Sequence, residues 1–197
     1  MASNGHDPDK EDILSRLRRD SRWLAASPTD GARQARRQRL TLAEAPLVAD
    51  LRLAGCAVTS VWDLVNQSTK YHKSVVPTLL EHLAREYPPE IRAGIARALA
   101  VPEARIAWDQ IVTAYKRETE RLVKEGLGVA VAAIAGRERL GELIALVLER
   151  RNGPSRVLFL QPISRSRDPR AVEVLRESEA DPELCREAAA ILRRRQK

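Results

Sequence analysis

The chain has 197 residues, of which 44% are apolar, 31% are charged and 4% are aromatic, and its net charge is +7. This composition is ordinary for a soluble globular chain, and no apolar run approaches the length of a membrane span. The segment Met1–Lys10 is polar and acidic and lacks the apolar stretch of a secretory signal. We therefore expect a cytoplasmic protein with no membrane partner. Its two cysteines, Cys56 and Cys185, are expected to be small core residues in a reducing compartment.

Residues 1–41 precede the regular part of the chain. The sequence predicts disorder at residues 1–9. It also predicts a helix with one apolar face over Glu11–Ala25 and a second helix over Gly31–Leu40. The apolar face of the first helix contains Ile13, Leu14, Leu17 and Leu24, with Trp23 beside it. The second helix is almost wholly polar and contains Arg33, Arg36, Arg37 and Arg39, so it can bury little surface of its own. We expect this segment to cap or tether the array that follows.

Farther along, the sequence repeats with a period of about 32 residues. A basic residue recurs in four similar blocks, at Arg92, Lys124, Arg156 and Arg186. Ahead of each block lies a set of apolar residues spaced to form one face of a helix. These sets are Leu79-Leu80-Leu83, Ile111-Val112-Tyr115, Leu143-Ile144-Val147 and Val174-Leu175. The period predicts an array of two-helix units, with the basic residue near the start of each second helix.

Proline and glycine mark the limits of the units. We predict a capping pair over residues 42–73, with helices near Thr41–Ala54 and Ser60–Asn66. The capping pair lacks the basic residue, as expected of a terminal unit with one neighbour. Full repeats are predicted at about residues 74–101, 102–136, 137–167 and 168–197. Asp168-Pro169 and Asp181-Pro182 each predict a helix start, with Asp as the N-cap and Pro at the first helical position.

Two of the blocks resemble the second helix of HEAT repeats, which typically reads Asp-x-x-Val-Arg followed by small and apolar residues. They are Pro88–Leu99 and Asp181–Leu192. Pro77 resembles the proline common in the first helix of such repeats, and the unit length suits the short bacterial HEAT-like variety. The resemblance implies an all-α fold, a right-handed, armadillo-like α-solenoid (α–α superhelix) of HEAT-like helix pairs.

The resemblance also implies a role for the basic residues. In HEAT repeats the recurring acid and base form a structural ladder between units, so Arg92, Lys124, Arg156 and Arg186 are expected to stabilise the array. An acid precedes the base by five or six residues in three units, as Glu86, Glu118 and Asp181. The third unit has Arg150 and Asn152 in that region, so an acid–base link is doubtful there.

The function implied is that of a non-enzymatic scaffold or adaptor. In such arrays the second helices line a concave face that binds extended partners. One residue per unit is expected to point into it: Arg97, Val129, Gln161 and Arg193. We expect another protein as the partner, and the sequence does not identify it.

Nucleic-acid binding is the alternative, because several stretches are rich in arginine. They are the Arg33–Arg39 helix, Arg150-Arg151, Arg165-Arg167-Arg170 and Arg193–Lys197. Acids lie near each stretch, which is typical of a solvated helix face, and no aromatic residues interleave to stack on bases. Whether the excess of arginine over lysine reflects function or genome composition stays open.

No motif in the chain predicts catalysis, a cofactor or a metal site. The histidines are His6, His72 and His82, and the last two are expected to be surface residues without metal-ligand spacing. Gly126-Leu127-Gly128 could resemble a phosphate loop, but it lies within a repeat helix and predicts close helix packing. Trp108-Asp109 resembles part of the site of HEAT-like DNA glycosylases, although neighbouring aromatics are missing. Phycobilin lyases also use such repeats, yet no pigment-attachment site is recognisable.

Overall fold

The computed structural model describes residues 30–66 and 74–195. Within these ranges every regular element is a helix and no strand occurs. The predictions made for residues 1–25, for His6 and for His72 lie outside the described residues. The all-α fold class is therefore confirmed for the described part of the chain.

A single helix, α3 (Asp30–Leu53), stands where two helices were predicted, over Gly31–Leu40 and Thr41–Ala54. The two-helix prediction was wrong because no glycine or proline separates the two segments. Pro46 lies farther along and is accommodated inside α3.

The chain divides into two structural units between Leu42 and Ala43, so the division falls within α3. The residues of α3 before the division are mostly exposed, in keeping with their polar sequence. After the division, Leu47 and Leu51 are fully buried. The second unit therefore begins with an amphipathic half-helix.

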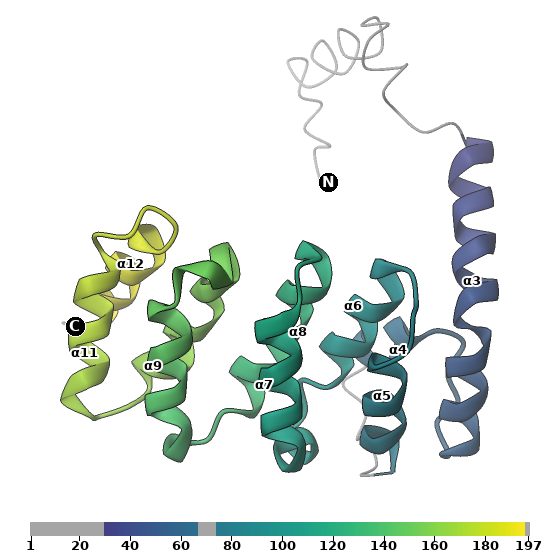
Figure 1. The fold of residues 1–197 in the computed structure, drawn as a ribbon, viewed down its shortest axis with the longest axis horizontal. Helices are drawn as coiled ribbons and strands as arrows, with labels where there is room; N and C mark the ends of the chain where they lie inside the picture. Colours follow the sequence, from purple (N-terminus) through teal and green to yellow (C-terminus); the bar gives the residue numbers. More distant parts are fainter. Residues whose placement is uncertain (1–29, 67–73, 196–197) are drawn as a thin grey trace, which may run out of the picture. The chain divides into compact units, whose positions relative to one another are not determined.

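The second unit continues as pairs of helices (Figure 1). The half-helix of α3 is followed by α4 (Val61–Asn66). The later pairs are α5 (Val75–Leu83) with α6 (Pro89–Ala98), α7 (Trp108–Arg117) with α8 (Arg121–Ile134), α9 (Leu140–Leu148) with α10 (Leu160–Ser164), and α11 (Pro169–Ser178) with α12 (Cys185–Arg195). Short 3₁₀ helices connect them: η1 (Pro102–Ala107), η2 (Arg137–Arg139) and η3 (Arg150–Phe159).

The second helices of neighbouring pairs pack directly on one another. α6 lies between α4 and α8, and α8 in turn contacts η3. Glycine makes the closest of these approaches possible. A Cβ atom added at Gly126 would lie 2.9 Å from the carbonyl oxygen of Ala93, and one added at Gly128 would lie 2.8 Å from Leu158. The prediction that these glycines serve helix packing is confirmed.

The apolar positions that recur with the period of the array form the core. Leu79, Ile111, Leu143 and Leu175 occupy matching places in the first helices, and all are buried. Between the pairs, the ring of Tyr115 meets that of Phe159 edge-on, with ring centroids 5.2 Å apart. Packing of this kind, repeated between neighbours, holds the unit together.

The third pair departs from the predicted helix–turn–helix form. Its basic block lies in η3, which is interrupted at Gly153 (φ 66°). Pro154 follows that glycine, and only α10 continues as a short α-helix. A glycine in the left-handed region followed by proline cannot continue an α-helix, so the second helix starts late.

Two smaller predictions have different outcomes. Asp168 is the N-cap of α11 as predicted, since its side chain accepts a hydrogen bond from the backbone N–H of Arg170 and Pro169 opens the helix. The prediction of core cysteines was wrong, because Cys56 and Cys185 are free and only half-buried. Partial burial nevertheless raises the pKa of the Cys56 thiol.

Candidate functional site

Two of the recurring basic residues, Arg92 and Arg156, bind acids of the pair that follows. The guanidinium of Arg92 donates to the carboxylate of Glu118 in the next pair. Arg156 is 3% exposed and reaches Asp181 at 2.8 Å and Glu183 at 2.6 Å, both in the next pair. Its guanidinium also donates to the carbonyl oxygen of Val147 at 3.1 Å.

The acid in each of these links is the one that precedes the next base along the chain, so the links run between neighbouring units. The turn inside each pair lies beside the second helix of the pair before it, so the acid of one pair meets the base of its predecessor. The third unit, where a link was doubtful, has the most extensive one, because the acids come from the fourth.

Lys124 uses backbone acceptors instead. Its ammonium donates to the carbonyl oxygens of Tyr115 at 3.1 Å and Glu118 at 3.2 Å, and lies 4.7 Å from the centroid of the Tyr115 ring. The third pair carries Arg150 where the second has Glu118, so no carboxylate is available there. Burial lowers the pKa of Lys124, and burial likewise raises the pKa of Tyr115 to about 12.

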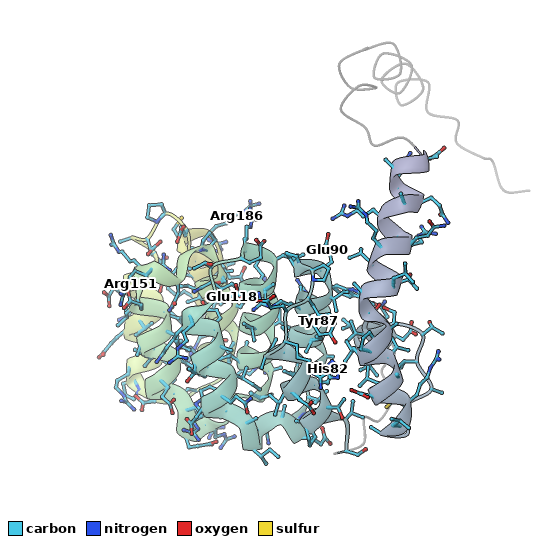
Figure 2. The ribbon with its side chains drawn as sticks, turned by 45° about the vertical axis from the view of Figure 1, so that its right-hand side comes forward. His82, Tyr87, Glu90, Glu118, Arg151 and Arg186 are labelled. Carbon is cyan, nitrogen blue, oxygen red and sulfur yellow. The ribbon has the colours of Figure 1, made fainter. Side chains whose placement is uncertain are left out.

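Arg186 differs from the other three basic residues. It is exposed and, among the residues that the structure describes, has no hydrogen-bond or ion-pair partner (Figure 2). No further pair is described beyond α12 that could offer an acid. Its register matches the other three residues, but its surroundings do not.

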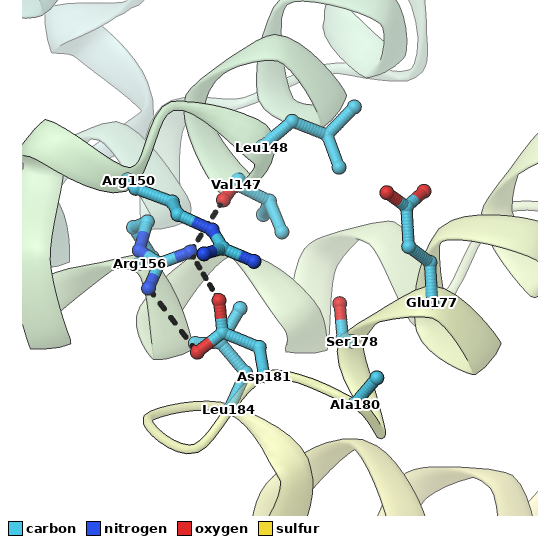
Figure 3. A pocket seen from close by; sticks show the side chains of 9 residues that line it. All are labelled: Val147, Leu148, Arg150, Arg156, Glu177, Ser178, Ala180, Asp181 and Leu184. Carbon is cyan, nitrogen blue, oxygen red and sulfur yellow. Dashed lines mark hydrogen bonds and ion pairs between the residues drawn. The ribbon is translucent and has the colours of Figure 1, made fainter.

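A pocket of about 250 Å³ lies where Arg156 meets the fourth pair (Figure 3). Arg150, Asp181 and Glu177 contribute its polar lining, and Val147, Leu148, Ala180 and Leu184 its apolar lining. The hydrogen bond from Arg156 holds the pKa of Asp181 below its usual range. Arg156 and Asp181 already bind each other, so the pocket presents a completed ion pair, whereas the carboxylate of Glu177 lines it without a hydrogen-bond or ion-pair partner among the described residues.

The residues predicted for the binding face are all at least partly accessible. Arg97 of α6 and Val129 of α8 are half-buried, whereas Gln161 of α10 and Arg193 of α12 are exposed. Glu125, one turn before Val129, is also half-buried and adds an acid to the same surface. The accessible residues of the second helices are thus mixed in charge and partly apolar.

His82 was predicted to lie at the surface, and this was wrong. It is fully buried, with one ring nitrogen 2.7 Å from the hydroxyl of Tyr87 and the other 2.9 Å from the carboxylate of Asp50 (Figure 2). Buried imidazoles need such partners on both nitrogens. Asp50 and His82 are 32 residues apart, so the period of the array could have revealed the pairing.

Trp108 links the second and third pairs. Its ring is buried, its indole N–H donates to Glu142 at 2.8 Å, and the guanidinium of Arg139 lies 5.2 Å from the ring centroid. Two hydrogen bonds lower the pKa of Glu142: the one from Trp108 has the larger effect and the one from Arg139 the smaller. A tryptophan used in this way has no face open to a nucleotide, so the structure offers no base-binding pocket at this residue.

Two kinds of feature are absent from the described residues. No group of three or more His, Cys, Asp or Glu side chains is arranged to hold a metal ion. No helix in those same ranges combines the length and apolarity that a membrane crossing requires.

Comparisons with protein-family models, with curated proteins and with solved structures found no significant match.

Proposed function

We propose that the chain is a short HEAT-like α-solenoid, a right-handed superhelix, that acts as a non-enzymatic scaffold for another protein. The period supports this proposal, since it recurs in contacts as well as in sequence: Asp50 binds His82 one period later, and Arg92 binds the turn of the following pair. A succession of similar pairs, each packed on its neighbours, is the arrangement expected of a repeat array.

The mixed character of the accessible second-helix residues is the observation on which the partner class rests. Arg97, Glu125, Val129 and Gln161 combine positive, negative, apolar and amide groups along the proposed concave face. A face for nucleic acid is expected to be continuously basic, whereas protein interfaces combine apolar contacts with scattered polar groups. A protein partner therefore suits this face better.

The hydrogen bonding of the buried polar groups also favours a scaffold over an enzyme. No buried side-chain nitrogen or oxygen within the described residues lacks a hydrogen-bond partner. Catalytic sites usually contain ionisable groups that are incompletely solvated or hydrogen-bonded, so that their pKa values are shifted. His82 has the most reactive type of side chain in the core, and both of its ring nitrogens have hydrogen-bond partners.

Affinity capture with a face variant tests this proposal. The variant changes Arg97→Glu, Val129→Asp and Gln161→Arg together. Its matched control changes Arg117→Glu, Thr113→Asp and Gln110→Arg, which are exposed residues of the first helix α7. We expect proteins captured by the parent, with and without nuclease, to be lost with the face variant and kept with the control. Equal capture by both variants, or loss on nuclease treatment, would contradict the proposal.

A further inference from the structure

Three arginines lie in the segments that join one helix pair to the next, and a fourth, at the end of α12, lies against the last of these segments. Arg105 of η1 donates to the carbonyl oxygen of Ile134 at 3.3 Å, close to the loop that holds Arg137. Arg137 and Arg165 line one pocket. Arg195 donates to the carbonyl oxygens of Ser164 at 2.9 Å and Ser166 at 3.3 Å, on either side of Arg165. We call Arg105, Arg137, Arg165 and Arg195 the inter-pair edge.

The charges of the inter-pair edge are not neutralised by carboxylates. All four arginines are exposed, and none forms an ion pair with any residue in the described ranges. At the turns inside the pairs, Arg92, Arg121, Arg151 and Arg156 are each paired with an acid, whereas Arg117, Arg150 and Arg186 form no ion pair among the described residues. Positive charge is thus left available at all four residues of the inter-pair edge.

The acids near the inter-pair edge do not compensate this positive charge. The carboxylate of Asp168 is held by Arg170 at 2.7 Å. Glu138 folds back against Gly136, and Glu103 is half-buried in η1. Four arginines therefore face solvent alongside Glu103, Asp109 and Glu138, three carboxylates that have no ion pair among the described residues.

The pocket between Arg137 and Arg165 has an apolar floor. Its volume is about 230 Å³, and Ala135, Leu140, Leu143 and Pro162 line it. Sites for small molecules are usually larger, at roughly 300–1,000 Å³. A pocket of this size between two guanidinium groups suits one apolar side chain flanked by carboxylates.

We propose that the inter-pair edge binds an acidic peptide segment of a partner protein, with carboxylates on Arg137 and Arg165 and an apolar side chain in the pocket. Nucleic acid fits less well. Phosphates gain nothing from the apolar side chains that line the pocket, no aromatic residue lines it, and the ring of Trp108 is buried and cannot stack on a base. None of the residues changed in the second-helix face variant lines this pocket, so either proposal can fail without the other.

Fluorescence anisotropy with a labelled peptide tests the inference. The probe repeats Glu-Leu-Glu-Glu three times, and a second probe has Gln in place of every Glu. The full chain is compared with the double variant R137Q/R165Q. The matched control is R121Q/R151Q, which removes two exposed arginines that are already paired with Glu125 and Glu149.

We expect the acidic probe to bind the parent, and its dissociation constant to rise on the order of tenfold in R137Q/R165Q as two charge pairs are lost. The control variant is expected to bind like the parent, and added salt to weaken binding. Three results would overturn the inference: equal binding of the Glu and Gln probes, equal loss in both variants, or tighter binding of a DNA duplex of the same length. Thermal melting shows whether both variants stay folded.

Discussion

Each of the three guanidinium nitrogens of Arg156 donates a hydrogen bond. Nε binds the carbonyl oxygen of Gly153 at 3.0 Å, and the other two bind Val147, Asp181 and Glu183. A guanidinium that is 3% exposed is tolerable only with this degree of pairing. The same residue type at Arg186 is exposed and has no partner within the described residues. Sequence register is thus not enough to define a residue's energetic role.

The first prediction compares three arginines that share one register. Arg156→Ala should lower the free energy of unfolding by about 1.5–3 kcal/mol, because it leaves two carboxylates and two carbonyl oxygens without their charged donor. Arg92→Ala should lower the free energy of unfolding by an amount at or below the lower end of that range, because Arg92 is half-buried and has one carboxylate partner. Arg186→Ala should change stability by less than about 0.5 kcal/mol. Urea unfolding of the three variants measures this order, and equal effects would contradict it.

The second prediction concerns acid. Arg156 depresses the pKa of Asp181, so the folded state holds its ionised form more strongly than the unfolded chain does. This contribution is fully present above the ordinary aspartate pKa of about 3.9 and is lost as the pH falls through the depressed value. Asp181→Asn should therefore lower Tm clearly at pH 7, and the difference from the parent should shrink below about pH 4. A difference that stays constant down to acid pH would show that the carboxylate charge is unimportant.

At the scale of the element, α8 depends on glycine for its approach to α6. An ideal Cβ at Gly126 would lie 2.9 Å from a backbone oxygen of α6 and 3.1 Å from the Cβ atom of Ala96. Backbone atoms cannot move aside as a flexible side chain can. The two helices would have to separate along their whole contact, which is the most extensive between any two helices described here.

The third prediction uses a pair of glycines. Gly126→Ala should lower the free energy of unfolding by up to about 2 kcal/mol, because overpacking costs about 1–3 kcal/mol and the helix-propensity gain offsets only about 1 kcal/mol of that. Gly141→Ala in α9 should leave stability unchanged or raise it by up to about 1 kcal/mol, since nothing lies within 4 Å of the new methyl group. Thermal unfolding of both variants supplies the comparison. Stabilisation by both would mean that α6 and α8 are less closely packed than described.

For the molecule as a whole, contacts run mainly between neighbouring pairs. α12 packs on α10 and α11, and α4 packs on α6. In an array of this kind stability is approximately a sum of unit and interface terms, so a weakened interface loosens one end and leaves the other intact.

The fourth prediction follows from that locality. Arg156 holds the interface between the third and fourth pairs. Arg156→Ala should therefore speed amide hydrogen exchange in α11 and α12 while α5 and α6 keep their protection. Mass spectrometry of peptides after exchange measures each region separately. A uniform loss of protection along the chain would indicate one cooperative core and would count against the solenoid proposal.

How much the sequence determined depends on the range of the interactions involved. Helix content, the matching apolar faces around Leu79, Ile111 and Leu143, and the capping of α11 by Asp168 all follow from local spacing and turn chemistry. The glycines of α8 were also assigned correctly, because small residues inside an amphipathic helix indicate close packing. These features involve residues within one helix or at matching places in successive helices.

Only the tertiary structure decided which partner each polar residue meets. Arg92 binds Glu118 and Arg156 binds Asp181, each in the following unit, and these contacts depend on how neighbouring pairs pack. His82 was predicted to be a surface residue, but it is buried in the core, where it contacts Asp50 and Tyr87. The physical reason is that a charged or polar side chain is stable in either environment, provided it is solvated or paired. Its burial therefore depends on where a distant helix lies, which local spacing does not encode.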